Sequence, residues 1–384
     1  MTIYRVAYCN RTDAQMAVDL KPGLDVNAAL DRAIMSAAEN IDGQLHRVFY
    51  PSDDTRFFDW PSQGGSSGGQ YAEPWRLWLD DNDLACMTQL VSGGVTIPLS
   101  AVFAEPVNNP QKGRPFYTYL ELDRSQSYWF GNNSQTPQHS IQITGTWGYG
   151  ALADPAGALA ASVGSTDTTV TVTDGSQAGP GDLIILGYAL GEAPFPTAYG
   201  YAGAIQPFQG ERVLITGVSA VATGLTQSGG GVTTAGNADQ ALSVTGSGAL
   251  NAGEVIVLDQ EDMLVEQVVS GVATVRRAWN GTTLATHSGA TVYAFRQFSV
   301  NRAQLGTTAS AYSSAAAVYR HRVPQLVRDL AIAESSIQLL QEGSGYARTV
   351  GSGEAASPAP GIALMDKWGE VRARHGRKAR YRGV

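Results

Sequence analysis

The chain has 384 residues, of which 43% are hydrophobic, 16% are charged and 44 are glycine; this length is sufficient for two or three domains, and the composition is typical of strand-rich chains. The formal net charge of -8 excludes a protein that binds nucleic acid along its whole surface. No apolar run is long enough to span a membrane, the first residues lack a signal-peptide core, and Cys9 and Cys86 alone exclude a disulfide framework, so we expect a reducing compartment.

The first predicted element is a long helix that begins near Asp25 and ends at about Phe49. Asp25 is a residue type that caps helix N-termini, and apolar residues follow it at three- and four-residue spacing. The alanines among them would let a neighbouring helix or subunit approach closely. The apolar stripe consists of Val26, Ala29, Leu30, Ala33, Ile34, Ala37, Ala38, Ile41 and Leu45.

Short elements are predicted next. One strand lies around Arg56–Trp60, and a second lies where Trp75, Leu77 and Leu79 alternate with polar residues. A loop rich in glycine and serine separates the two strands. The following residues then predict a short helix over Leu84–Val91.

Three acids, Asp80, Asp81 and Asp83, precede this predicted helix. Clustered acids can form a calcium site, but these lack the alternating ligand spacing and the distal glutamate of a calcium loop. Turn chemistry and helix capping by Asp83 explain them better. Further strands and a loop of proline and asparagine lead to a strand that ends at Trp147.

A repeat follows this strand. The spacing from Thr169 to Gly181 equals the spacing from Ala241 to Gly253, and both stretches alternate apolar and small polar residues as strands do. Each glycine lies where a turn begins the next strand.

Each copy of the repeat also has a second matching strand, which begins at Glu211 in the first copy and at Glu261 in the second. We therefore predict an all-β segment, 157–298, that consists of two related modules. The modules span about 160–225 and 236–298.

The first module carries an additional loop rich in aromatic residues. Five aromatic side chains in so short a segment favour a contact with another subunit or partner over an unstructured insertion. The predicted contact residues are Tyr188, Phe195, Tyr199, Tyr201 and Phe208.

The helix that should follow Trp147 is predicted only after this segment, at Val323–Glu342. Pro324 suits the first helical turn, and Gly343 suits the end. Because an insertion costs little when its ends lie close together, the outer segments 1–156 and 299–361 are predicted to form one discontinuous domain. The predicted fold class is α+β, in which a discontinuous domain of helices and strands carries an inserted all-β domain made of two related modules.

Catalytic motifs are absent from the sequence, which has no nucleophile elbow, zinc-protease motif, phosphate loop or dinucleotide fingerprint. A hydrogen bond that stabilises a turn explains His287 better than catalysis does. Glu261 and Asp262 do not by themselves indicate a glycosidase, because that chemistry depends on separation in space. We therefore predict that the protein is not an enzyme and uses no cofactor or metal.

The last residues, 362–384, are basic. Such a run is either a solvated terminus or a peptide that docks on an acidic partner or nucleic acid. Leu364, Trp368 and Val371 fall at helical spacing, and a segment that only solubilises the chain needs no tryptophan. We favour docking, with a tail composed of Trp368, Arg372, Arg374, Arg377, Lys378, Arg380 and Arg382.

The outer segments resemble the head–tail connector (adaptor) proteins of tailed bacteriophages, over residues 1–150 and 320–384. The strongest part of the resemblance is Trp147-Gly148-Tyr149 directly after a strand. The stretches that carry it, in order, are VNAALDRAIMSAAENIDGQLHRVF, TRFFDW, LWLDDNDLACMTQLVSGG, EPVNNPQKGRPFYTYLEL, ITGTWGYG and VPQLVRDLAIAESSIQLL.

This resemblance implies a structural virion protein at the head–tail interface, assembled in the cytoplasm of the bacterial host. It implies a homo-oligomeric ring, usually of twelve copies, between the portal protein and a downstream head–tail stopper or tail protein, with no membrane partner. Genomic DNA would pass non-specifically through the ring, which a net acidic chain suits. The copies would meet through interfaces that close by rotation.

The resemblance also implies that 362–384 docks on the portal. Trp368 would be the apolar anchor, and the arginines would bind portal carboxylates. Truncation after Gly361 is then expected to leave a folded ring that no longer attaches to the portal.

Two other functions stay open. The β repeats and the aromatic loop also suit a receptor- or carbohydrate-binding tail protein, which glycan binding by 157–298 would support. A cell-wall hydrolase would need a carboxylate pair in a cleft. The helical outer segments and the basic tail favour the adaptor.

Overall fold

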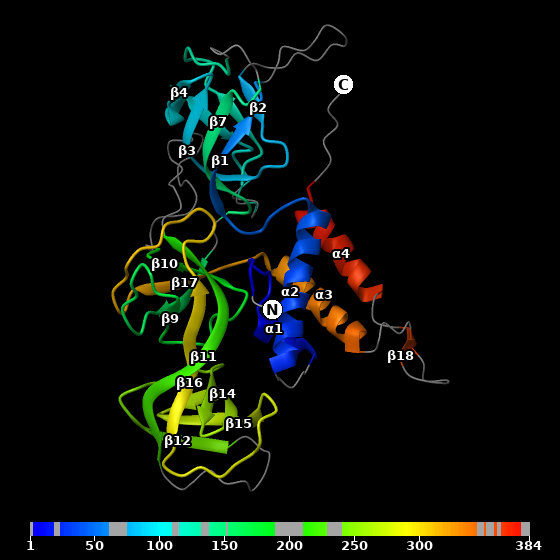
Figure 1. Ribbon diagram of the computed structural model, residues 1–384. Helices are drawn as coiled ribbons and strands as arrows, with labels where there is room; N and C mark the ends of the chain where they lie inside the picture. Colours follow the sequence, from blue (N-terminus) through cyan, green and yellow to red (C-terminus); the bar gives the residue numbers. More distant parts are fainter. Residues whose placement is uncertain are drawn as a thin grey trace.

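A computed structural model shows the chain as a column of three β modules with a layer of helices beside its middle (Figure 1). The structure describes residues 3–18, 24–60, 75–109, 114, 116–131, 138–150, 153–188, 210–228, 240–343, 349–350, 357–358 and 362–377.

The helices are α1 (Arg11–Val18), α2 (Leu24–Leu45), α3 (Gln325–Gly343) and α4 (Ile362–His375), with a short 3-10 helix η1 (Leu99–Ala101). The first β module contains β1 (Ser52–Phe58), β2 (Arg76–Trp78), β3 (Leu84–Ser92), β4 (Val95–Ile97), β5 (Val102–Glu105), β6 (Tyr119–Leu122) and β7 (Ile141–Trp147). The other two modules contain β8 (Ala153–Ala158), β9 (Thr169–Thr171), β10 (Leu183–Leu186), β11 (Glu211–Gln227), β12 (Gln240–Gly246), β13 (Val255–Leu258), β14 (Glu261–Val269), β15 (Val272–Trp279), β16 (Thr291–Asn301) and β17 (Ala317–His321). A small hairpin, β18 (Thr349–Val350) and β19 (Ser357–Pro358), lies between α3 and α4.

The predicted α+β fold class is wrong, because the chain is mainly β, with 41% strand and 21% helix. The described residues of the first outer segment form the helices α1 and α2 and then a β module with seven strands, β1–β7. One of these strands, β3, replaces the short helix predicted over Leu84–Val91. The apolar run in this segment is compatible with either structure, and central pairing with β7 and β4 decides in favour of a strand.

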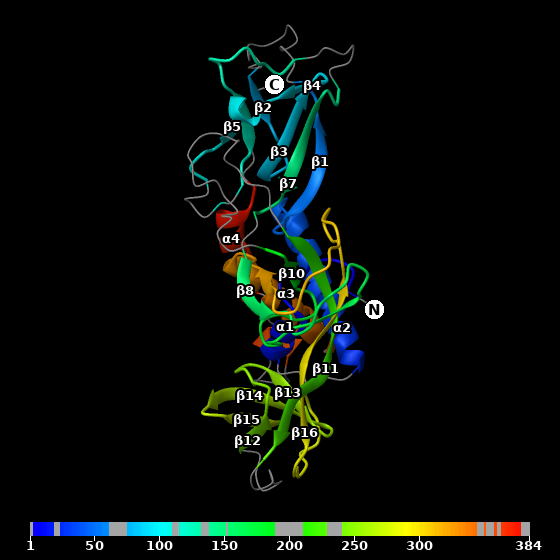
Figure 2. The same ribbon diagram turned by 90° about the vertical axis from the view of Figure 1, so that its left-hand side faces the viewer.

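The first β module, which we call the sandwich, packs two antiparallel sheets face to face. Their strand orders are β1-β7-β3-β4 and β2-β6-β5, and Figure 2 shows them on opposite sides of the module. Alternation along the strands directs Leu90, Ile143, Leu120 and Trp147 into one buried core between the sheets. Trp147 is fully buried there, and its indole nitrogen donates a hydrogen bond of 3.0 Å to the Asp54 carbonyl.

The other two β modules are barrels that share two long strands. β11 pairs with β16 antiparallel from Leu214–Asn301 to Thr226–Thr291, so both strands run from one barrel into the next. The first barrel takes β8, β17, β10 and β9 with one half of each shared strand, and a bridge between Leu159 and Val172 links its ends. The second barrel takes β12, β15, β14 and β13 with the other halves, and closes with six strands. Each barrel has its own apolar core.

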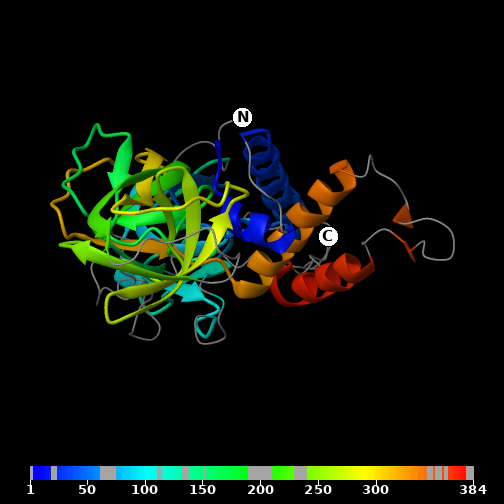
Figure 3. The same ribbon diagram turned by 90° about the horizontal axis from the view of Figure 1, so that it is seen from below.

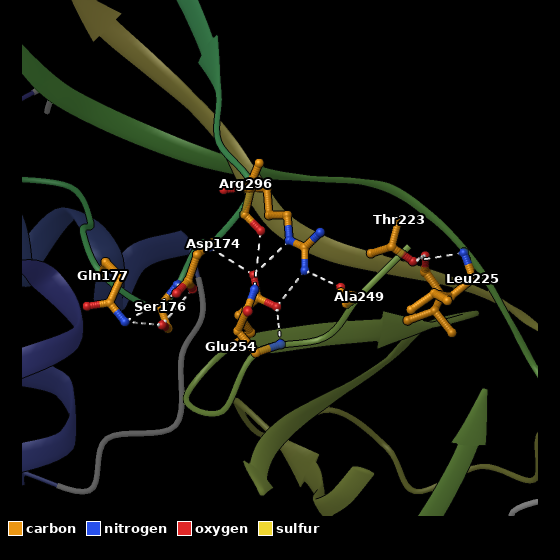
Figure 4. A network of polar contacts seen from close by, with 12 residues as sticks. Asp174, Ser176, Gln177, Thr223, Leu225, Ala249, Glu254 and Arg296 are labelled. Atoms are coloured by element: carbon orange, nitrogen blue, oxygen red, sulfur yellow. Dashed lines mark hydrogen bonds and ion pairs between the residues drawn. The ribbon is translucent and has the colours of Figure 1, made fainter. Parts of the chain in front are cut away.

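A buried ion pair fastens the two barrels to each other (Figure 4). Arg296, on shared strand β16, donates two hydrogen bonds of 2.7 Å to the carboxylate of Glu254 in the second barrel. The same carboxylate accepts a 2.8 Å bond from the backbone amide of Gly175, in the first barrel. A Cβ at position 175 would lie 2.1 Å from the Phe295 carbonyl oxygen, so only glycine permits this approach.

The helical layer packs against one side of the first barrel (Figure 3). Its core combines residues of α2, α3 and α4 with Leu183 and Leu214 of the barrel. The N-terminal segment adds backbone hydrogen bonds, such as the 3.1 Å bond from Ala7 to the Gly181 carbonyl. None of the described helices is long and apolar enough to cross a membrane.

The position of Trp147 relative to α3 bears on the predicted discontinuous domain. Trp147 lies in the sandwich core, whereas Tyr149, two residues later, lies in the helical core with Val327 and Leu330 of α3. The predicted boundaries after 156 and 298 fall inside β8 and β16, both strands of the first barrel. The division into domains at these positions stays a prediction.

Candidate functional site

Helix α4 and Arg377, the second residue after it, fasten the helical layer to the sandwich. The side chain of Val371 is fully buried in the helical core, and Leu364 and Trp368 pack against that core from the same face of α4. The spacing of these residues, at i, i+4 and i+7, explains why this segment forms an amphipathic helix. Arg372 and Arg374 are exposed; Arg372 lies at the edge of the apolar face, where it donates to Gln44 Oε1 of α2 and its guanidinium lies 5.3 Å from the centre of the Trp368 ring.

The end of α4 is held by a set of polar contacts that we call the C-terminal clamp: Arg47, Asp83, Tyr149, His375 and Arg377. Arg47 follows α2 and donates to the His375 carbonyl at 2.7 Å and to Asp83 Oδ2 at 2.6 Å. Tyr149 Oη and His375 Nδ1 lie 3.2 Å apart. The guanidinium of Arg47 also lies 4.2 Å from the centre of the Phe116 ring.

Arg377 makes the direct connection to the sandwich. Its backbone amide donates to the Leu45 carbonyl at 3.1 Å, which joins it to the end of α2. Its guanidinium donates to the carbonyl oxygens of Asp80 and Asp81, at 2.5 and 2.9 Å, in the turn before β3. It also lies 3.0 Å from Asp83 Oδ1, whose side chain is 3% exposed, so two arginines neutralise one buried carboxylate.

The predicted turn role of Asp80, Asp81 and Asp83 is therefore only part of their function, because this acidic turn is the receptor for Arg377. No group of three or more His, Cys, Asp or Glu residues that could hold a metal ion occurs in the part of the chain that the structure describes. The helix that Asp83 was predicted to cap does not form, since β3 begins at Leu84.

A cavity of about 460 Å³ lies beside the clamp. Acidic and basic groups line it together, among them Asp42, Arg47, Arg56, Asp83 and Arg377. Burial raises the pKa of Asp42 to about 6, although Tyr8 and Arg5 oppose this shift. Ser52 and His46 also line it, and among the described contacts no hydrogen bond joins them. The paired charges of the lining suit a structural joint between the helices and the sandwich.

The clamp makes stability depend on pH through His375. Burial, with the nearby charges of Arg374, Arg47 and Arg114, lowers the pKa of His375 from 6.5 to about 4. Between these two values the unfolded chain binds a proton that the folded chain does not, so the free energy of unfolding falls as the pH falls.

We expect wild-type protein to lose more stability than the variant His375→Gln when the pH is lowered from 7 to 4.5. Comparing the two proteins cancels the contributions of other groups, including Asp42. The urea midpoint of each protein at several pH values measures the difference. Parallel pH dependence in the two proteins would contradict this role of His375.

The residues predicted to contact partners fall into four groups, of which the first is the exposed pair Arg372 and Arg374 on α4. Trp368 packs against the chain's own core, its ring centre 5.3 Å from the Arg372 guanidinium, while Arg377 belongs to the clamp. Lys378, Arg380 and Arg382 lie outside the described residues, as do Phe195, Tyr199, Tyr201 and Phe208 of the aromatic loop. Tyr188 is described, and its ring centre lies 4.9 Å from that of Tyr319 in the same chain.

Sequence reasoning missed a second set of polar contacts, a glutamate–arginine ion pair that occurs once in each barrel. In the second barrel, Glu261 begins β14 and receives hydrogen bonds of 2.7 and 2.6 Å from Arg277; both side chains have no exposed surface. In the first barrel, Glu211 begins β11 and receives bonds of 2.6 and 2.7 Å from Arg302. We call these pairs the barrel clamps.

A sequence signal for the barrel clamps was present. The stretch RAWNGTT from Arg277 matches RAQLGTT from Arg302, and the alanine after each arginine has a positive φ, 51° and 53°. The matching threonines, Thr282 and Thr307, each accept a hydrogen bond from the residue after the clamp glutamate. The duplication therefore extends beyond the repeat that strand spacing reveals.

His287 belongs to the clamp of the second barrel. Its ring nitrogens lie 2.7 Å from Asp259 and 2.9 Å from Glu261, which supports the structural interpretation of this residue. Burial by itself raises the pKa of Glu261, but the hydrogen bonds from Arg277, from the Ala285 amide and from His287 outweigh it and hold the pKa at about 2. The carboxylate is therefore charged at neutral pH and has no general-acid role there.

Comparison with protein-family models, with curated proteins and with solved structures finds no match to this chain.

Proposed function

We propose that this chain is a structural virion protein, a head–tail adaptor whose copies form a ring between the portal and the tail. The proposal begins from the ordered resemblance of the outer segments to head–tail connectors. The observation that carries it furthest is that α4 is fixed by the C-terminal clamp while two of its arginines, Arg372 and Arg374, stay exposed. A fixed helix that leads into a basic terminal segment is a suitable device for attachment to an acidic partner.

The arrangement of the modules also supports an assembly role. Buried polar contacts connect the modules: Arg377 joins the helices to the sandwich, and Arg212 lies 2.9 Å from Asp53 between the first barrel and the sandwich. The side chain of Arg212 has no exposed surface. A chain whose modules are joined in this way can transmit a fixed geometry from one partner to the next.

The proposed ring has twelve copies, with the portal on one side and a stopper or tail protein on the other. DNA would pass through without specific contacts, as a net charge of -8 favours. The structure modifies the predicted docking set, since Trp368 already packs inside the chain. The proposal therefore assigns portal contact to Arg372, Arg374 and the basic residues 378–384.

We expect a chain that ends after Arg377 to fold normally but to bind portal rings of the same virus at least tenfold more weakly. It keeps α4 and the clamp, and it loses only Lys378, Arg380 and Arg382 among the basic residues. Co-sedimentation with portal rings measures the loss. The double variant Arg372→Glu/Arg374→Glu should weaken binding in the same way.

The matched control is the double variant Arg276→Glu/Arg322→Glu. It removes two arginines whose side chains are 54% and 55% exposed and lie on β15 and beyond β17, far along the chain from α4. Its binding should equal that of wild type. Equal binding by the chain that ends after Arg377 would reject the docking role of the terminal residues.

A further inference from the structure

The outer face of the sheet β2-β6-β5 carries a group of aromatic and charged side chains that no role above explains. Leu77, Leu120 and Ala104 pair across the three strands and point into the sandwich core. Their neighbours along each strand therefore point outward. This outer group, which we call the aromatic platform, consists of Arg76, Trp78, Phe103, Glu105, Tyr119 and Glu121.

Strand register arranges the platform in two rows. One row runs Phe103, Glu121, Arg76 across the sheet, and the other runs Glu105, Tyr119, Trp78. Each row thus sets a carboxylate next to an aromatic ring. All six side chains are partly exposed, although apolar rings on a strand are more often directed into a core.

The platform is ordered by its own contacts. The ring centres of Trp78 and Tyr119 lie 4.4 Å apart at an angle of 44°. Arg76 donates a 2.6 Å hydrogen bond to Glu121, and its guanidinium lies 5.6 Å from the centre of the Tyr119 ring. Glu105 is oriented by a 2.7 Å bond from the amide of Val107. The rings and carboxylates are therefore held in position before any ligand binds.

The charges of the platform restrict the class of ligand. Two carboxylates and one guanidinium give it a net negative charge, which disfavours a phosphate backbone beside the rings. Glutamate is depleted in the cores of protein–protein interfaces, yet here two glutamates lie beside the three rings. A neutral, hydroxylated ring meets both conditions, because its C–H face stacks on an aromatic ring and its hydroxyls donate to carboxylates.

We propose that the aromatic platform is a saccharide-binding site, which would be a function additional to the adaptor role. Trp78 and Tyr119 stack against sugar rings, and Glu121 and Glu105 accept hydrogen bonds from their hydroxyls. Arg76 holds Glu121 in place and donates to ring or hydroxyl oxygens. The site lies on the sandwich, whose strands β2 and β5 Figure 2 shows at one end of the column. Strand β2 ends two residues before Asp80, which accepts a hydrogen bond from Arg377 of the C-terminal clamp.

A glycan array that includes cellohexaose, maltohexaose, mannohexaose and bacterial surface polysaccharides tests the proposal with the full-length chain. We expect at least one glycan to bind, and titration calorimetry with that glycan then gives the effect of each variant. Trp78→Ala and Tyr119→Ala should weaken binding at least tenfold. Tyr119→Phe, which keeps the ring, should stay within threefold of wild type, and so separates stacking from loss of structure.

The control variant is Trp129→Ala, which removes a ring that is 64% exposed in a loop outside the platform. Its affinity for the glycan should equal that of wild type. Absence of any glycan binding, or binding that Trp78→Ala and Tyr119→Ala leave unchanged, would overturn the proposal. Binding of a single-stranded oligothymidylate or a polyproline peptide in place of glycans, with loss in the same variants, would also overturn it.

Discussion

Replacing Arg277 with methionine is expected to unfold the second barrel or to lower its free energy of unfolding by about 3–5 kcal/mol, the range for breaking a buried ion pair. Arg277 has no exposed side-chain surface, and its removal leaves the carboxylate of Glu261 buried without its main partner. Because the pKa of Glu261 is held at about 2, this carboxylate stays charged at neutral pH in the intact clamp.

The neighbouring residue supplies a matched control. Arg276 pairs with Glu266 on the barrel surface, where its side chain is 54% exposed, so Arg276→Met should cost only about 0.2–1 kcal/mol. Arg302→Met should resemble Arg277→Met, because Arg302 holds the equivalent Glu211 in the first barrel. Urea unfolding of the three variants measures the costs. A cost for Arg277→Met as small as that for Arg276→Met would contradict the role of the barrel clamps.

The second large effect is expected from ending the chain after Gly361, which removes α4. A fully buried valine alone contributes about 1.5–3 kcal/mol, and Val371 is fully buried. Loss of Arg377 also removes one of the two arginines that neutralise Asp83. We therefore expect the helical layer to lose more than about 3 kcal/mol of stability. Truncation after Gly361, expected from the sequence to leave the fold intact, is thus not a clean test of docking.

Two point variants test how much the packing of α4 contributes to stability without shortening the chain. Val371→Asp places a charge in the helical core and should destabilise nearly as strongly as removal of the helix. Ala373→Asp introduces the same side chain at an exposed position of the same helix and should have little effect. Thermal unfolding with circular dichroism distinguishes them. Wild-type stability in Val371→Asp would show that α4 does not pack as described.

Local patterns predicted many of the elements. Alternation and equal spacing predicted strands at 169–186 and 240–258, and the structure has β9, β10, β12 and β13 there. Pro324, Gly343 and the apolar stripe between them predicted the α3 helix to within two residues at each end. Both signals lie in short stretches of sequence, where the period of the apolar residues and the residue types at the ends are sufficient to predict a helix or a strand.

Long-range pairing was not predictable in the same way. The apolar stretch Leu84–Val91 has no decisive period, and its position between β7 and β4 makes it a strand. Strand spacing suggested two separate modules, whereas β11 and β16 each run through both barrels. These features depend on which strands meet in space, and this is why the α+β prediction failed.

The candidate site was predicted only in part. Helical spacing indicated an amphipathic segment around Trp368 and Val371, but the sequence did not show that its apolar face packs on the chain's own core. The acidic turn at Asp80–Asp83 and the basic Arg377 were each noted, about 300 residues apart, with nothing to join them. The structure shows Arg377 bound to the acidic turn. Arg377 therefore anchors α4, whereas Arg372 and Arg374 stay exposed.

Electron microscopy of the full-length chain mixed with portal rings of the same virus tests the central proposal most directly. The adaptor proposal predicts a closed ring of copies seated coaxially on the portal, with α4 of each copy facing the portal surface. Copies that stay monomeric on mixing, or a ring that binds elsewhere on the virion, would contradict it.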